Sequence, residues 1–213
     1  MKRIVWDWNG TLLNDVNLCF ECINRLLVSK NLDPLIDLAA YRDIFEFPIQ
    51  NYYQKAGFNF DKTPYEVLAG EYMKDYQEKS YDCQLFEDVY ETLRKAHFFG
   101  FPQCILSASR KDYLLKQIEK FDILDYVDSV HGIENIYASS KKELARKYVE
   151  SCSLEDEIWF VGDSVHDYEV ANTLKANCIL VTTGHQSRQK LERVDAIIAD
   201  SLLESLEIIY ETN

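Results

Sequence analysis

The chain of 213 residues is acidic, with 23 lysines and arginines against 36 aspartates and glutamates and a formal net charge of −13. This charge disfavours non-specific binding to nucleic acid or to anionic membranes, and no apolar run in the sequence approaches membrane-spanning length. Hydrophobic residues make up 47% of the chain, which is enough for the core of one large or two small domains.

The predicted elements begin with a short strand at residues 2–7, centred on the apolar run Ile4, Val5 and Trp6. Apolar residues then recur at helical spacing between residues 14 and 84, which predicts an all-helical insertion. Beyond it, short apolar runs alternate with amphipathic stretches. The strands expected there are 103–107, 127–131, 158–163, 178–182 and 195–199, and the helices are 87–98, 110–120, 141–150, 167–175 and 201–210. Such alternation is typical of an α/β fold, a parallel sheet flanked by helices.

Asp7 directly follows the first predicted strand and enters a glycine turn, in the segment Asp7-Trp8-Asn9-Gly10-Thr11. The spacing places a carboxylate at the carboxyl end of a strand beside backbone N–H groups. Such an arrangement can attack a phosphorus atom and hold the charge that results. An ordinary Asp-X-Asn-Gly turn gives the same five residues, so this segment alone leaves both interpretations open.

A second acidic segment follows the apolar run 158–161, and it reads Gly162-Asp163-Ser164-Val165-His166-Asp167. If a helix opens at His166, the carboxylates of Asp163 and Asp167 face one point. Oxygen ligands of this kind suit Mg²⁺, a hard cation that needs few carboxylates. The alternative for Asp167 alone is an acidic residue stabilised by the positive end of a helix.

Two further polar positions lie between these segments. The apolar run 104–106 ends in Ser107-Ala108-Ser109, where the Ser107 hydroxyl can bond a phosphate oxygen, whereas Ser109 is better explained as a helix N-cap. Ser140 and Glu143 form a capping box, which puts Lys141 on the first turn of a helix. A cation there opposes the helix dipole, and a bound phosphate with a nucleophilic carboxylate would explain it. Further capping boxes are expected at Ser201–Glu204 and at Thr63–Glu66, the latter with Pro64 at the first helical position.

In these motifs the chain resembles the haloacid dehalogenase superfamily, and within it the branch that includes phosphoglycolate phosphatases. The resemblance rests on four motifs in order, which span nearly the whole chain: Asp7 to Thr11, Ser107, Lys141, and Gly162 to Asp167. It implies a Rossmann-like core, Mg²⁺ as cofactor and an aspartyl-phosphate mechanism. The implied roles are Asp7 as nucleophile, Thr11, Ser107 and Lys141 as phosphoryl ligands, and Asp163, Asp167, Asp7 and the main-chain oxygen of Asn9 as metal ligands.

One position departs from the pattern of this family. Its phosphatases carry a second aspartate two residues after the nucleophile, and the present chain has Asn9. In the family that carboxyl group protonates the leaving oxygen and later activates water, and an amide does neither. Because the metal ligand at residue 9 is a main-chain oxygen, we expect metal binding to survive and turnover to be reduced.

The resemblance also places a helical cap where the insertion lies. It predicts a core domain made of residues 1–13 and 85–213 and a cap domain made of residues 14–84, which closes over a small substrate. Within the cap, Arg42, Phe45 and Pro48 are candidates to face the site. A surface ion pair would equally explain Arg42, and packing would equally explain Phe45.

The cysteines and histidines carry no clear ligand pattern. Cys19 and Cys22 form a C-x-x-C at helical spacing on an apolar face, which favours core packing over redox or zinc chemistry. His166 and His185 lie near the proposed site, but solvated loop positions explain them better. The N-terminus enters a strand without the layout of a secretory signal, so we expect a cytoplasmic protein.

The leading hypothesis is therefore a Mg²⁺-dependent phosphatase, phosphoglycolate phosphatase-like, that acts on a small phosphorylated metabolite, with no nucleic-acid or membrane partner. A second hypothesis is a phosphate-binding pseudoenzyme or regulatory module weakened by Asn9. A third is a phosphonate hydrolase that uses a cap lysine such as Lys30 or Lys55. The sequence leaves the oligomeric state open.

Overall fold

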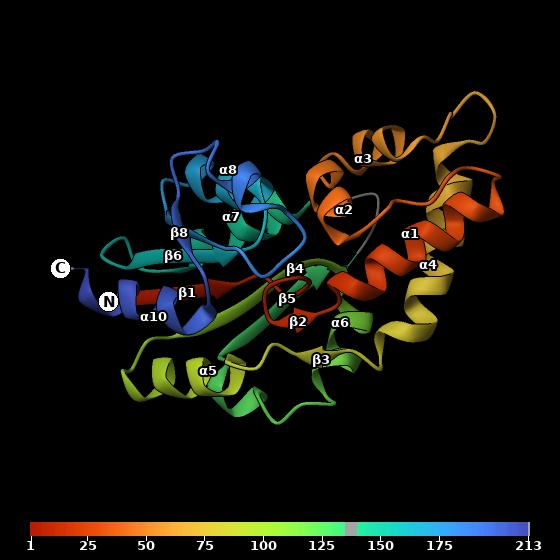
Figure 1. The fold of residues 1–213 in the computed structure, drawn as a ribbon. Coiled ribbons are helices and arrows are strands. Elements are labelled where there is room, and N and C mark those ends of the chain that lie inside the picture. The colour runs from red at the N-terminus through yellow and green to blue at the C-terminus, as the bar shows by residue number, and fades with distance from the viewer. Residues whose placement is uncertain (135–139, 213) are drawn as a thin grey trace.

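The computed structural model describes residues 1–134 and 140–212, and its centre is a parallel sheet (Figure 1). Every pairing in the sheet is parallel, and the strands lie in the order β5-β4-β1-β6-β7-β8. The strands are β1 (Lys2–Trp6), β4 (Gln103–Arg110), β5 (Ser129–Ile133), β6 (Glu157–Gly162), β7 (Asn177–Val181) and β8 (Ile197–Ala199). The predicted α/β fold with a Rossmann-like parallel sheet is therefore confirmed.

Helices cover both faces of this sheet, as Figure 1 shows. One face packs against α5 (Val89–Phe98), α6 (Lys111–Ile118) and α10 (Leu202–Glu211), and the other against α7 (Lys141–Ser151), α8 (Val165–Thr173) and α9 (Arg188–Leu191). The five helices and six strands predicted outside the insertion are all present, with ends within three residues of the expected ones. The four-residue α9 and a 3-10 turn at Leu124–Tyr126 are too short to show a periodicity, and neither was predicted.

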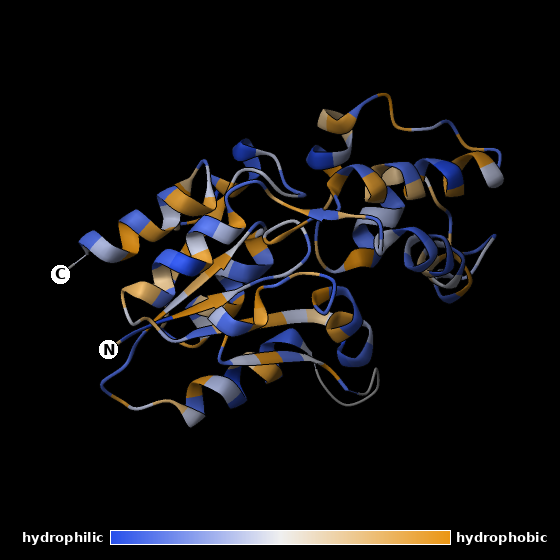
Figure 2. Ribbon diagram, turned by 90° about the horizontal axis from the view of Figure 1, so that it is seen from below, coloured by the Kyte–Doolittle hydropathy of each residue, from blue (hydrophilic) through white to orange (hydrophobic). Residues whose placement is uncertain are grey.

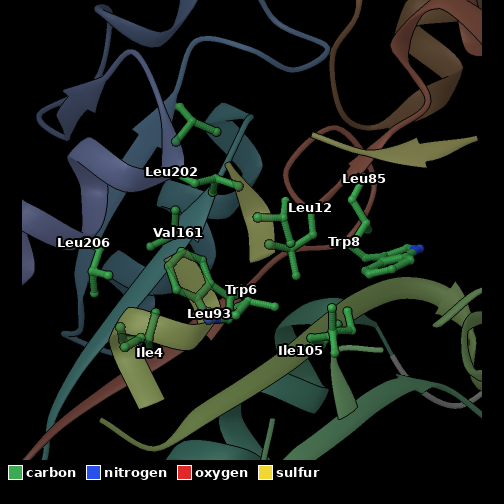
Figure 3. Close-up of a cluster of buried hydrophobic side chains, with 14 of the residues drawn as sticks. Ile4, Trp6, Trp8, Leu12, Leu85, Leu93, Ile105, Val161, Leu202 and Leu206 are labelled. Carbon is green, nitrogen blue, oxygen red and sulfur yellow. The ribbon is translucent and has the colours of Figure 1, made fainter. Parts of the chain in front are cut away.

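The central strand β1 shows why its sequence is an unbroken apolar run. Ile4 and Trp6 belong to the core on one face, while Val5 belongs to the core on the other. A strand buried on both faces has no polar side to show. Figure 2 shows these hydrophobic strands between helices of mixed hydropathy, and Figure 3 shows Trp6 and Ile4 packed with Leu93, Leu202 and Leu206.

The insertion forms a separate group of helices, at the right of Figure 1. Its helices are α1 (Val16–Ser29), α2 (Leu38–Ile44), α3 (Ile49–Ala56) and α4 (Tyr65–Ser80), and they share a core that includes both Cys19 and Cys22. The predicted helices and the predicted packing role of these two cysteines are confirmed. Two-residue strands, β2 (Leu13–Asn14) and β3 (Gln84–Leu85), pair antiparallel where the chain enters and leaves the insertion. Strands this short carry no sequence signal, and neither was predicted.

Ser140 and Ser201 occupy the predicted N-caps, but the reciprocal bond of a capping box is missing at Ser201, because the Glu204 carboxylate accepts from the main-chain N–H of Asp200 at 2.6 Å. Ser140 and Ser201 accept hydrogen bonds from the main-chain N–H groups of Glu143 and Glu204. The capping box expected at Thr63 is wrong, because Pro64 itself occupies the N-cap of α4 in an extended conformation. No helix described in residues 1–134 and 140–212 is both long and apolar enough to cross a membrane.

Candidate active site

Three neighbouring strands bring the predicted site residues to one edge of the sheet. Asp7 follows β1, Ser107 lies in β4 on one side of β1, and Asp163 follows β6 on the other side. Because these strands are parallel, their carboxyl ends meet at one edge, where ligands bind in such sheets. A cavity of about 480 Å³ opens there, and all three residues line it together with Asn9 and Lys141.

Lys141 connects the two acidic segments. Its Nζ lies 2.6 Å from Asp7 Oδ1 and 2.6 Å from Asp167 Oδ1, and its side chain is almost fully buried. These two carboxylates stabilise a cation on the first turn of α7, a place where the helix dipole opposes it. The geometry therefore joins Asp7, Lys141 and Asp167, three residues that the sequence predicted to meet.

The pKa values of the carboxylates in this cluster are shifted in different directions because their surroundings differ. Burial, with the nearby charges of Asp167 and Asp163, raises the pKa of Asp7 to about 7 although Lys141 opposes the shift. Burial and the charge of Asp167 likewise raise the pKa of Asp163 to about 6, against the attraction of His185. The pKa of Asp167 is lowered: burial opposes this, but Lys141 and the Ser164 hydroxyl outweigh it.

The same carboxylates form a donor set that fits a hard divalent cation. Oxygen atoms of Asp7, Asp163 and Asp167 all lie within 4.8 Å of one another, and the one lysine in the cluster pairs with Asp7 and Asp167 but not with Asp163. Such a cluster lacks positive charge, and Mg²⁺ prefers carboxylate oxygens of this kind. The donor set therefore agrees with the predicted cofactor.

Gly10 allows this close packing. Its φ is +71°, a conformation that favours glycine, and a Cβ atom there would collide with the carboxylate of Asp163 and the ring of His185. Asp163 in turn accepts a hydrogen bond of 2.6 Å from the main-chain N–H of His185. The glycine turn after Asp7 therefore allows the candidate nucleophile to lie close to Asp163 in the second acidic segment.

The side chain of Asn9 is held by four hydrogen bonds. Its Nδ2 donates to Asp15 Oδ2 (2.8 Å) and to the Tyr76 hydroxyl (2.7 Å), and its Oδ1 accepts from Ser109 Oγ (2.9 Å) and, at 3.5 Å, from Ser107 Oγ. Both donor hydrogens of the amide are therefore used, and its oxygen faces hydroxyl donors. These surroundings suit an amide at residue 9, because a carboxylate there would lie beside the carboxylate of Asp15 and could donate no hydrogen bond to it.

Asp15 is the buried anion of this network, and the sequence did not point to it. It accepts from Asn9, from the Tyr76 hydroxyl (2.7 Å) and from the main-chain N–H of Gly10 (2.9 Å), while His185 Nε2 lies 3.2 Å from its Oδ1. Burial works against its charge, but His185 and these donors lower the pKa of Asp15. A carboxylate only accepts, so Nε2 of His185 carries a hydrogen, and its Nδ1 lies 2.8 Å from the Tyr41 hydroxyl.

Two predictions near this network are wrong. His185 is buried at 5% exposure between the insertion and the sheet edge, so a solvated loop position does not describe it. Ser109 does not cap a helix: the N-cap of α6 is Arg110, and the Ser109 hydroxyl donates to Asn9. In both cases the partner lies in another segment of the chain, and local sequence patterns do not show such partners.

Asn9→Asp tests the charge pattern of the network. We expect this substitution to lower the free energy of unfolding by about 3 kcal/mol, because an oxygen replaces the amide donor 2.8 Å from Asp15. The double variant Asn9→Asp/Asp15→Asn should recover at least half of the loss, because an amide at residue 15 can donate to the new carboxylate. Urea unfolding of the wild type, the single variant and the double variant measures both quantities.

The matched control is Asn17→Asp, which adds the same charge at an exposed position on the first turn of α1. It should change the free energy of unfolding by no more than about 0.5 kcal/mol. A fully stable Asn9→Asp variant, or a double variant no more stable than the single one, would contradict the assigned hydrogen bonds.

The remaining predicted residues lie in different surroundings. The Thr11 hydroxyl is buried without a hydrogen-bond partner in the described part of the chain. Ser107 lines the cavity, and its Oγ accepts from the main-chain N–H of Ser109 at 3.0 Å.

Arg42 donates to the carbonyl oxygens of Gly184 (2.9 Å) and Thr183 (2.8 Å), so it links the insertion to the loop after β7. Its predicted contact with substrate stays a prediction, as do the catalytic roles of the other residues.

The two cap lysines named for a phosphonate hydrolase lie in ion pairs. Lys30 Nζ lies 2.7 Å from Glu71, and Lys55 pairs with Glu46. In the described residues, no lysine of the insertion lines the cavity. The geometry therefore gives no support to an imine-forming lysine.

Comparisons with known proteins agree with this geometry. The family model of the haloacid dehalogenase-like hydrolases matches residues 4–181, which include both acidic segments. No curated protein matches the chain.

Several solved structures share the fold. One is described as a predicted phosphatase from Clostridium acetobutylicum (19% identity, 99% of each chain covered, TM-score 0.80), and one as a haloacid dehalogenase-like family hydrolase from Streptococcus pneumoniae (17%, 97% of each, 0.82). A third is described as a predicted phosphoglycolate phosphatase from Haemophilus somnus (18%, 98% of each, 0.71). At these identities the likeness concerns the fold. With a family model matched over most of its length, the chain belongs to the haloacid dehalogenase-like hydrolase family.

Proposed function

We propose that the protein is a Mg²⁺-dependent phosphatase that hydrolyses a small phosphorylated metabolite through an aspartyl-phosphate on Asp7. The observation that carries the proposal is the cluster of Asp7, Lys141, Asp163 and Asp167, of which Asp7, Lys141 and Asp163 line the cavity and Asp167 lies buried beside them. A carboxylate nucleophile, a lysine beside it and an acidic donor set are what transfer of a phosphoryl group needs. The mechanism follows the pattern of the phosphoglycolate phosphatases that the sequence resembles.

Each residue has a definite task in this mechanism. Asp7 attacks phosphorus, and Lys141 stabilises negative charge on the phosphoryl oxygens during the transfer. Ser107 donates a hydrogen bond to the same group, and Thr11 is assigned there through the resemblance, with its hydroxyl free of other partners in the described chain. Asp7, Asp163, Asp167 and the main-chain oxygen of Asn9 would hold Mg²⁺, whose chemistry is to neutralise charge on the phosphoryl oxygens.

The insertion acts in this proposal as a cap domain of residues 14–84 on a core of residues 1–13 and 85–213. Its contacts with the sheet edge support this role, because Arg42 bonds to the loop after β7 and Tyr41 bonds to His185. A cap over the cavity would exclude water during the transfer. A cytoplasmic location fits the six cysteines, all of which lie in the described chain as free thiols.

The second candidate is a phosphate-binding module without useful turnover, and Asn9 favours it. An amide at residue 9 removes the carboxyl group that would protonate a leaving oxygen. The two candidates share the same binding cluster and differ in hydrolysis, so a measurement of turnover separates them.

Metal dependence tests the proposed phosphatase. We expect EDTA to remove hydrolysis of acetyl phosphate and added Mg²⁺ to restore it, while Ca²⁺, with its larger and looser coordination shell, inhibits. Mg²⁺ should also raise the melting temperature of the wild type, because it binds only the folded site. Asp163→Asn should lose both responses, and Asp195→Asn, which changes an exposed aspartate far from the cluster, should keep both.

The outcomes are distinct. Thermal stabilisation by Mg²⁺ without any hydrolysis would favour the phosphate-binding module. Full activity in EDTA, with no effect of Mg²⁺ on the melting temperature, would contradict the metal assignment.

A further inference from the structure

We propose that the phosphate esters hydrolysed at this site are small aryl phosphates, whose leaving group is an aromatic ring oxygen. The inference rests on the phosphatase function proposed above and names its substrate class. Two independent features of the cavity lead to it: the walls that the insertion supplies, and the amide at residue 9.

The walls opposite the phosphoryl end are apolar and aromatic. Phe45, Phe47, Ile49, Tyr72 and Met73 line the cavity from the insertion, while Asp7 and Lys141 line it from the core. In the described chain, the insertion contributes no lysine, arginine or histidine to this lining. The insertion also lines the cavity with Asp15, Tyr76 and Gln77, so a leaving group that extends from phosphorus toward the insertion meets mainly, but not only, carbon surface.

A second anionic group on the substrate would compete with carboxylates of the protein for the cations of the lining. Lys141 already pairs with two carboxylates, His185 Nε2 lies 3.2 Å from Asp15, and Arg110 pairs with Asp112 through two nitrogen atoms at an exposed position. A carboxylate such as that of phosphoglycolate would lose hydration against the apolar part of the walls, where no cation of the insertion replaces it. The cavity therefore selects against the substrate of the enzymes that the chain resembles.

An aromatic ring finds favourable surfaces in the same place. The Phe47 ring stacks on His166 with centroids 4.7 Å apart, and the Phe45 ring stacks on His185 at 4.9 Å. Phenyl rings prefer such stacked or edge-on neighbours to aliphatic ones. The cavity of about 480 Å³ lies in the size range of small-molecule sites and accommodates one ring and a phosphate.

The amide at residue 9 selects the same class on chemical grounds. An alkyl oxygen leaves poorly unless an acid protonates it, and both hydrogens of the Asn9 amide are bound to Asp15 and Tyr76. A phenol oxygen, with a pKa of about 10, leaves as the anion. It needs no proton at the moment of bond cleavage, so an aryl ester reacts without the missing carboxyl group.

The reaction then balances in two steps. An Asp7 oxygen bonds to phosphorus while the bond from phosphorus to the ring oxygen breaks, and the phenolate departs with the electron pair and takes a proton from water. A water molecule next attacks phosphorus and gives its proton to solvent. The bond to Asp7 breaks, which releases inorganic phosphate and restores the carboxylate.

A set of four esters separates the two features of the cavity. Phenyl phosphate combines a ring with a good leaving group, benzyl phosphate keeps the ring with a poor one, acetyl phosphate keeps a good leaving group without a ring, and phosphoglycolate has neither. With Mg²⁺ present, kcat/KM for phenyl phosphate should exceed that for benzyl phosphate and for phosphoglycolate by at least about 10²-fold.

Phe47→Leu tests the aromatic wall. It should raise KM for phenyl phosphate about three- to tenfold, the loss expected for one aromatic pair, and leave KM for acetyl phosphate unchanged. Phe98→Leu is the matched control, because Phe98 is 85% exposed on α5 and does not line the cavity. It should leave both values unchanged.

Each outcome has one meaning. Turnover of acetyl phosphate with phenyl phosphate no better than phosphoglycolate or benzyl phosphate overturns the aryl assignment and leaves the phosphatase in place. Equal effects of Phe47→Leu on phenyl and acetyl phosphate also overturn it. Preference for a phosphotyrosine peptide over phenyl phosphate would replace it with a protein substrate. No Mg²⁺-dependent hydrolysis of any ester overturns the phosphatase itself.

Discussion

Asp7→Asn should lower kcat for acetyl phosphate by at least about 10⁴-fold, which is the scale of effect seen when a covalent catalyst loses its nucleophile. The amide cannot form an acyl phosphate. It still offers an oxygen to Lys141, which lies 2.6 Å from the present carboxylate, so the fold should persist. Phosphate release measures the turnover, and the urea unfolding midpoint measures the fold.

Beryllium fluoride gives this test a second readout. It mimics an acyl phosphate when it binds an aspartate, so with Mg²⁺ it should raise the melting temperature of the wild type and leave that of Asp7→Asn unchanged. Asp195→Asn, an exposed charge change, should behave as the wild type in both assays. Turnover by Asp7→Asn within tenfold of the wild type would contradict an attack by this residue.

The core fold was predictable because its strands are buried on both faces. Ile4, Val5 and Trp6 contribute to two different cores, so the sequence shows them as one apolar run. Amphipathic stretches between such runs mark the covering helices, and a helix between consecutive strands returns the chain so that the strands pair in parallel. The small strands β2 and β3 escaped prediction, since two residues show no alternation.

The acidic half of the site was predictable for a related reason. Residues directly after parallel strands share one edge of the sheet, so Asp7 and Asp163 could be placed together from their positions alone. Lys141 was found because it violates a local rule, a cation at the positive end of a helix. The structure supplies the carboxylates that explain it.

The second half of the site depends on contacts that no local pattern contains. Asp15 precedes α1 and resembles an N-cap, yet its side chain makes no cap hydrogen bond and turns toward Gly10 and Asn9. Tyr76 occupies one of several aromatic positions on α4, and only the packed insertion shows that its hydroxyl reaches Asp15. The position of His185 just after β7 was the one available signal, because that strand is the neighbour of β6.

Lys141→Met should have the second-largest effect, and it acts on both stability and turnover. Methionine keeps the length of the side chain and removes the charge between Asp7 and Asp167. Without metal, two buried carboxylates then lack their partner, which should lower the free energy of unfolding by about 3–5 kcal/mol. Loss of a charge that stabilises the transferring phosphoryl group should lower kcat by about 10²–10³-fold.

Mg²⁺ distinguishes this electrostatic role from a packing role. A divalent cation on the same carboxylates supplies positive charge, so the rise in melting temperature on adding Mg²⁺ should be larger for Lys141→Met than for the wild type. Lys142→Met is the matched control: its side chain is exposed, and stability, turnover and the Mg²⁺ response should all stay as in the wild type. An equal Mg²⁺ response in Lys141→Met and the wild type would mean that Lys141 and the metal do not share these carboxylates.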